Sequence, residues 1–299
     1  MDFWQYRTIY QSLKATYPNI NPDQQYRESM DACLASGSVA SAHQVESEYV
    51  WAKNKKPYYS VYPSIIPMLT RLNLDIDSGL VKIPMDVLCI RFPKSHNPLI
   101  FTFEDQRYEM RAIMMSRTFV KDSLGMTLWM DYGETMTLPN PEGKPYEFPV
   151  MTYRNFRCRT GQTIEQDLIE LPTEPSSDTG VQIPLETQKD VVRLCCSLCL
   201  MQHDPEIISP DVLNADQEKY EKTKDQKFIE KSHRRGKVGW IVGAKLEVIP
   251  HVRRPHPAIV WTGKGRTVPK VVFRKGSIVH RKAVERLPSG FEKLEEPTQ

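Results

Sequence analysis

Val87-Leu88-Cys89-Ile90-Arg91-Phe92 is a short apolar run that ends at Pro93. Runs of this length, rich in β-branched and aromatic residues and bounded by turn residues, are typical of β-strands. Three more such runs follow after polar turns, at residues 99–103, 108–115 and 126–132. We therefore predict a four-stranded antiparallel meander at the centre of the chain.

Helical patterns flank this predicted sheet. Aromatic and apolar residues recur at helical spacing between Trp4 and Tyr17, and a second helical stretch at 23–53 is broken near 35–38. We expect further helices at residues 65–72, 165–171 and 191–201. The predicted fold class is α+β: a helical N-terminal region, a central antiparallel sheet with flanking helices, and a basic C-terminal β module.

The composition is that of a folded protein, with 40% hydrophobic and 26% charged residues among 299. No run approaches the roughly 20 apolar residues that a membrane span requires. The N-terminus begins Met-Asp-Phe-Trp and lacks the basic segment and apolar run of a secretory signal. We expect a cytoplasmic protein with no membrane partner.

Cysteine usage argues against disulfides and against a metal site. A chain of this size without an export signal is expected to keep its six thiols reduced. Cys195, Cys196 and Cys199 form a Cys-x-x-Cys, but they lie in an apolar helical pattern and no second pair completes a zinc set. We predict that they pack in the core, and we expect neither a metal nor a cofactor.

Charge is strongly uneven along the chain. Residues 1–218 carry 20 Lys and Arg against 29 Asp and Glu, whereas residues 219–286 carry 19 against 5, a net of +14. We divide the chain into an acidic α+β body (1–215), a charged helical connector (216–236) and a basic C-terminal β module (237–299). A basic module binds phosphate backbones by releasing condensed counterions, while the other possibility is that it packs against the acidic body.

The most distinctive sequence lies in this module. Residues 250–266 read Pro-His-Val-Arg-Arg-Pro-His-Pro-Ala-Ile-Val-Trp-Thr-Gly-Lys-Gly-Arg, and strand-like runs follow at 271–273 and 278–280. The pattern Pro-His-x-Arg-Arg-x-His followed by Trp-x-Gly-x-Gly resembles the C-terminus of the "A two"-like family of type V-A anti-CRISPR proteins. The matching positions are Pro250, His251, Arg253, Arg254, His256, Trp261, Gly263 and Gly265.

This resemblance covers about 25 to 35 residues and implies a function. Members of the family occur in phages, plasmids and bacteria, and the resemblance implies an inhibitor that suppresses production of a CRISPR nuclease at its translation and message. The setting would be a bacterial or phage-infected bacterial cell. This chain has Pro257 where the family commonly has Trp, so a stacking role for that ring does not carry over.

Three hypotheses compete for the motif. The first is binding of RNA or a translating ribosome, because Arg stacks on bases and forks onto phosphates and Trp offers a stacking face. Its candidate residues are His251, Arg253, Arg254, His256, Trp261, Lys264, Arg266, Lys270 and Arg274. The second is a metal-independent ribonuclease in which His251 and His256 are general base and acid and Arg253 stabilises the phosphate. The third is a structural role.

The favoured function is regulatory binding rather than turnover. In that case the acidic body is free to recognise a protein, and a nascent chain is one such partner. A structural protein of a mobile element is a further alternative. The rest of the chain has no Walker loop, nucleophile elbow or His-Glu-x-x-His. Asp131 and Glu134 place two acids near a predicted strand end, which makes them a minor candidate site.

Overall fold

The protein is described by a computed structural model. It describes residues 2–9, 11–12, 21–35, 37–120, 123–138, 146–172, 181–205, 207–211, 222–223, 225, 227, 239–244, 251–253, 256–262, 268–274 and 277–279. Much of the connector expected at 216–236 therefore lies outside the described residues, as does 139–145 of the turn-rich loop that the sequence suggests at 139–149. Residues 146–149 of that loop form part of a strand instead. Among the described residues, no helix is both long and apolar enough to cross a membrane.

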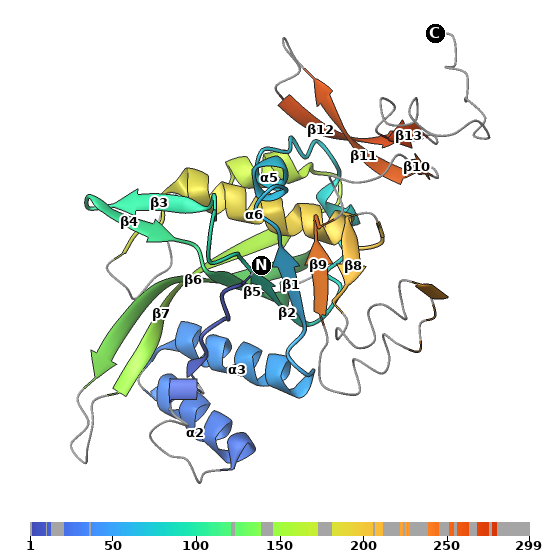
Figure 1. Ribbon diagram of the computed structural model, residues 1–299. Coiled ribbons are helices and arrows are strands. Elements are labelled where there is room, and N and C mark those ends of the chain that lie inside the picture. Colours follow the sequence, from blue (N-terminus) through green and yellow to red (C-terminus); the bar gives the residue numbers. More distant parts are fainter. Residues whose placement is uncertain are drawn as a thin grey trace.

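A seven-stranded sheet forms the centre of the molecule (Figure 1). Its strands are β1 (Tyr58–Val61), β2 (Val87–Arg91), β5 (Ala112–Val120), β6 (Ser123–Leu138), β7 (Tyr146–Cys158), β8 (Ile208–Pro210) and β9 (Gly239–Val242). Their spatial order is β7-β6-β5-β2-β1-β9-β8. β1 runs parallel to both β2 and β9, and the remaining neighbours are antiparallel.

The predicted antiparallel sheet is therefore a mixed one, and the predicted meander is wrong in one respect. β3 (Ile100–Phe103) and β4 (Gln106–Glu109) form a separate hairpin, and β2 pairs with β5 instead. Ile100 and Thr102 are exposed, so β3 lacks the two covered faces of a central strand. The parallel β1–β2 pair needs a crossover, and residues 62–86 supply it with α4 (Ile66–Thr70) and a 3-10 turn (Ser78–Leu80).

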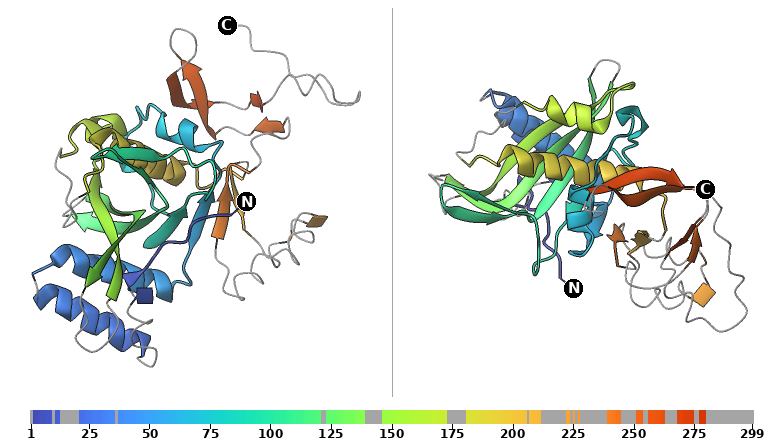
Figure 2. Two further views of the ribbon diagram at one scale, coloured as in Figure 1. Left: turned by 60° about the vertical axis from the view of Figure 1, so that its left-hand side comes forward. Right: turned by 90° about the horizontal axis from the view of Figure 1, so that it is seen from above.

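Helices cover both faces of the sheet. α2 (Pro22–Ala35) and α3 (Val39–Lys53) lie on one side, and α5 (Ile164–Ile169) and α6 (Leu185–Leu200) lie on the other (Figure 1). Seen from above, α6 crosses over the strands of the sheet (Figure 2). The larger core lies on the α6 side, and a smaller one that includes Trp51, Met114 and Trp129 lies on the α3 side. The predicted break at 35–38 separates α2 from α3, as expected.

The predicted first helix is only partly present, because among its described residues Ile9, Gln11 and Ser12 are helical and those before them are not. Residues 3–8 contain no helix, and this segment instead runs beside the sheet. Phe3 forms a β-bridge with Pro93, and the backbone N–H of Trp4 donates to the Phe92 carbonyl at 2.9 Å. Tyr6 is 2% exposed and packs edge-on against Trp51. Phe3, Trp4 and Tyr6 are therefore tertiary anchors of an extended segment that precedes the helical residues.

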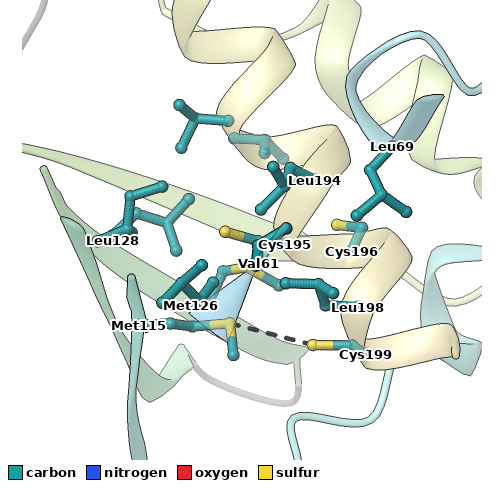
Figure 3. Close-up of a cluster of buried hydrophobic side chains, with 14 of the residues drawn as sticks. Val61, Leu69, Met115, Met126, Leu128, Leu194, Cys195, Cys196, Leu198 and Cys199 are labelled. Atoms are coloured by element: carbon teal, nitrogen blue, oxygen red, sulfur yellow. Dashed lines mark hydrogen bonds between the residues drawn. The ribbon is translucent and has the colours of Figure 1, made fainter. Parts of the chain in front are cut away.

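The cysteine helix is confirmed as a core element. Cys195, Cys196 and Cys199 are at most 1% exposed, and all six cysteines of the chain are free thiols. The thiol of Cys199 lies 4.0 Å from the Met115 sulfur on the neighbouring sheet (Figure 3). Burial in apolar surroundings raises the pKa of each of these thiols, which keeps them protonated.

The C-terminal strands belong to different sheets. β9, which the sequence groups with the basic module, lies in the main sheet between β1 and β8, and its Gly239 packs directly against the ring of Tyr58. Beyond it, β10 (His251–Arg253) pairs with β13 (Ser277–Val279) and β11 (His256–Thr262) pairs with β12 (Val268–Arg274). Both pairs are antiparallel two-stranded sheets. The division of the chain at 215 and 236 stays a prediction.

Candidate nucleic-acid interface and a groove in the body

The structure places most of the expected nucleic-acid-binding residues on three short strands. His251 and Arg253 lie on β10, His256 and Trp261 on β11, and Lys270 and Arg274 on β12. Arg254, Lys264 and Arg266 lie outside the described residues. The sequence motif is thus carried by strands, as its residue pattern predicts, and not by a helix.

The strand pairing separates the two histidines of the motif. His251 is paired with Val279 in the β10–β13 sheet, whereas His256 is paired with Arg274 in the β11–β12 sheet. Among the residues that the structure describes here, no ladder of backbone hydrogen bonds joins these two sheets. His256 instead has a cationic residue directly across from it, because directly opposed residues of an antiparallel pair have Cα atoms about 4.5–5.5 Å apart.

A groove of about 590 Å³ lies in the acidic body, between α3 and the sheet. One side is a single face of α3, where Val39, His43, Glu46 and Val50 follow one another at helical spacing. The other side consists of the beginning of β2 and the adjoining ends of β5, β6 and β7. From Val39 to Val50 the helix rises about 16 Å, which sets the length of the groove.

The groove has a polar floor made by three neighbouring strands. The hydroxyls of Thr118 and Thr127 lie 2.9 Å apart, and Thr127 Oγ1 donates to Asn155 Oδ1 at 2.7 Å. Ser116 is also part of the lining and lies two residues before Thr118 on β5. Polar groups on this face are unusual, because a sheet face covered by a helix is normally apolar. Such alternating polar residues in β5 are the signal by which the sequence could have revealed the groove.

Charges of both signs stand at the rim. Arg117 forms an ion pair with Asp86 at 3.4 Å, and His43 lies 3.5 Å from Glu46. Arg157 is exposed at the end of β7, and no carboxylate among the described residues pairs with it. The side chain of Trp129 is 2% exposed in the lining, and its indole N–H has no hydrogen-bond acceptor within the described part of the chain. Indole N–H groups that are buried usually have a partner.

The minor acidic candidate is structural. Asp131 is fully buried, and Arg7 holds both of its oxygens, with Arg7 Nη2 donating at 2.7 Å and Nε at 3.1 and 3.2 Å. The same guanidinium donates to the Glu134 carbonyl and to Thr135 Oγ1. Asp131 is therefore occupied in anchoring the N-terminal segment. In the part of the chain that the structure describes, no group of three or more His, Cys, Asp and Glu residues is arranged to hold a metal.

Comparisons with known proteins identify the family to which this chain belongs. The structure is similar to one published as "Crystal structure of AcrVA2", with a TM-score of 0.41 and 15% identity over 79% of this chain and 76% of that chain. No curated protein matches this chain. The model of the AcrVA2-like family, described as the anti-CRISPR type V subtype A2 family, matches residues 59–281, which include Tyr59–Val61 of β1 and all of the strands β10 to β13. This chain belongs to the AcrVA2-like family of anti-CRISPR proteins.

Proposed function

We propose that this protein lowers production of a CRISPR nuclease by binding RNA or the translating ribosome through its basic C-terminal region. One observation carries the proposal: residues 219–286 have 19 Lys and Arg against 5 Asp and Glu, whereas residues 1–218 have a net charge of −9. An RNA chain is a dense line of phosphates, and it attracts the positive end of a molecule charged in this way. The acidic body would be repelled by the same RNA.

Binding is favoured over cleavage by the strand pairing. A metal-independent ribonuclease needs a general acid and a general base on opposite sides of one phosphate. His251 and His256 belong to different two-stranded sheets, so their placement gives no support to such a pair. Arg253 lies on the strand of His251, and Arg274 lies opposite His256. This arrangement spreads positive charge over two two-stranded sheets, which suits contact with several phosphates.

The test measures RNA binding and RNA integrity together. The purified protein, Arg253→Ala/Arg254→Ala and His251→Ala would be incubated with a mixed RNA pool at low and moderate salt. We expect salt-sensitive binding of intact RNA that is lost in the arginine double variant and kept in His251→Ala. Shortened RNA whose production stops in His251→Ala would assign the ribonuclease instead. Neither binding nor cleavage would make the motif structural.

A second partner fits the body. The groove beneath α3 has a polar floor, an unpaired indole donor in its lining, and room along its length of about 16 Å for roughly five residues of extended chain. A peptide presents both N–H and C=O groups, which match hydroxyl and amide groups such as Thr118 and Asn155. We infer that this groove binds a segment of a protein. A nascent chain on the ribosome would bind in the groove while the basic C-terminal region contacts RNA or the ribosome.

Binding to arrested ribosomes distinguishes the contact of the groove with the nascent chain from the contact of the basic region with RNA or the ribosome. Ribosomes carrying the nascent CRISPR nuclease would be sedimented with wild-type protein or with Asn155→Ala/Arg157→Ala, which changes two exposed groove residues. We expect the groove variant to lose the part of the binding that puromycin release also removes, while binding to empty ribosomes persists. Equal retention of wild type and variant before and after puromycin would refute a role for the groove.

A further inference from the structure

The polar floor of the groove contains a chain of hydrogen bonds with one direction. Thr127 Oγ1 donates its single hydrogen to Asn155 Oδ1 at 2.7 Å. Thr118 is therefore the donor in the 2.9 Å contact between the hydroxyls of Thr118 and Thr127. The chain runs from Thr118 through Thr127 and ends on the carbonyl oxygen of the Asn155 amide. Its direction decides which polar groups of the floor are left for a ligand.

The groups left at the end of this chain are hydrogen-bond donors. Asn155 is exposed, and its amide nitrogen carries two hydrogens that have no acceptor among the residues described by the structure. Arg157 is also exposed and lies two residues further along β7, a distance of about 7 Å along the strand. The indole N–H of Trp129, which lies below the surface of the lining, likewise has no acceptor in the described part of the chain.

The strand register leaves space beside the two exposed donors. Asn155 is directly opposite Thr127. Arg157 is directly opposite Gly125, which in turn faces Thr118 on β5, and all three residues line the groove. Because glycine has no side chain, β6 leaves the space between Thr118 and Arg157 open, and directly opposed residues have Cα atoms only about 5 Å apart. A ligand group that enters this space reaches Arg157 and Asn155 together.

Arg157 also gives the groove a positive charge that the described residues do not offset. Arg117 is paired with Asp86 at 3.4 Å, and Glu46 lies beside His43 on α3. No carboxylate in the described ranges pairs with Arg157. A guanidinium binds a carboxylate through two parallel N–H···O bonds, because its fork of donors matches the two oxygens. A carboxylate is therefore the ligand group that satisfies both the guanidinium and the neighbouring amide donor.

We propose that the groove selects protein segments that contain Asp or Glu, and that Arg157 and Asn155 bind the carboxylate of this acidic side chain. The proposal rests on the proposed binding of a protein segment in the groove, and it adds the residue type that the segment must contain. An RNA phosphate has the same acceptor chemistry. However, residues 1–218 have a net charge of −9, which repels a polyanion far more strongly than a single carboxylate.

The experiment measures the binding of short peptides to the full chain. Overlapping peptides of about ten residues, twice the roughly five that the groove holds, would cover the sequence of the CRISPR nuclease. Each peptide that contains Asp or Glu is compared with a copy that has Asn or Gln instead. Fluorescence anisotropy gives the Kd of each binding peptide for the wild type, Arg157→Gln and Arg157→Glu. Arg107→Gln removes an exposed charge from β4 and is the matched control.

We expect the change from acid to amide in a binding peptide, and the change Arg157→Gln in the protein, each to weaken binding about tenfold, or about 1.4 kcal/mol. This is near the lower end for hydrogen bonds to charged groups, because Arg157 is exposed. Both changes together should cost little more than one, since each removes the same contact. Arg157→Glu should instead prefer copies in which Lys replaces the acid, and Arg107→Gln should bind as the wild type does.

Equal binding of acid and amide peptides, or wild-type affinity in Arg157→Gln, would overturn the carboxylate site and leave peptide binding by the groove in place. Weaker RNA binding by Arg157→Gln with unchanged peptide binding would assign these donors to phosphate, which also overturns the proposal. If no peptide binds the wild-type protein, the binding of a protein segment in the groove fails as well. Equal thermal midpoints of the wild type and Arg157→Gln check that a loss of binding is not a loss of folding.

Discussion

Replacement of Arg7 by Ala removes the cation that neutralises a fully buried carboxylate. Arg7 Nε and Nη2 bond to both oxygens of Asp131 at 2.7–3.2 Å, and Asp131 is 0% exposed while the Arg7 side chain is 28% exposed. Breaking a buried pair on one side typically costs 3–5 kcal/mol. Because Arg7 is partly exposed and water can enter the vacated space, we expect about 3 kcal/mol, the lower end of that range.

Urea denaturation followed by circular dichroism measures this loss. With a slope of about 3 kcal/mol per M, the unfolding midpoint of Arg7→Ala should fall by about 1 M. Arg107→Ala on the exposed strand β4 should change stability by less than about 0.5 kcal/mol and serves as the control. In a double-mutant cycle with Asp131→Asn, the two changes should cost clearly less together than the sum of the single changes. A loss below about 1 kcal/mol, or strictly additive costs, would refute the anchoring role.

Three further predictions concern the core. At pH 8.5 a thiol reagent should modify Cys33, which is half-buried, and should reach the other five cysteines only after unfolding; fast native labelling of a second cysteine would contradict the packing of α6. Burial raises the pKa of Cys89 and of Cys158 to about 12, so the unfolded chain loses these protons first as the pH rises above about 9. The free energy of unfolding that these protonated thiols contribute is fully present below pH 9 and should fall above it by about 1.4 kcal/mol per thiol and pH unit. A urea midpoint as high at pH 10.5 as at pH 8 would show that the thiols ionise in the folded state. Gly239→Ala places a methyl group 2.1 Å from a ring carbon of Tyr58 and should cost about 1–3 kcal/mol, which an unchanged thermal midpoint would disprove.

The sequence predicts those elements whose own pattern matches their environment. α2 and α3 were expected with the break between them, and α6 was expected as a core helix because its apolar run is long and contains the three cysteines. The strands that contain residues 271–273 and 278–279 were expected from their β-branched residues. In each case local propensity and burial point to the same structure.

The failures have physical causes. β7 was missed because it is an edge strand, and Pro149, Arg154 and Arg157 make it read as a polar loop. The beginning of the N-terminal segment was misassigned because Trp4 and Tyr6, which anchor to distant partners, happen to continue the helical spacing. The mixed topology was hidden because the partner of β1 lies about 180 residues later in the chain, and no local pattern records such a pairing. The groove escaped notice since its polar floor belongs to three strands.

β9 has a consequence for the order in which the protein assembles. Its four residues pair with β1 on one side and β8 on the other, so the sheet has a missing inner strand until residue 242 is available. A pairing between such distant segments is slow, because the entropy of closing the loop must be met before the contacts form. During synthesis, strands β1 to β7 are made long before their last inner neighbour arrives. A truncation that is meant to remove the basic strands β10 to β13 should therefore end after Ala244, because a cut at residue 237 would also leave the body without one of its own strands.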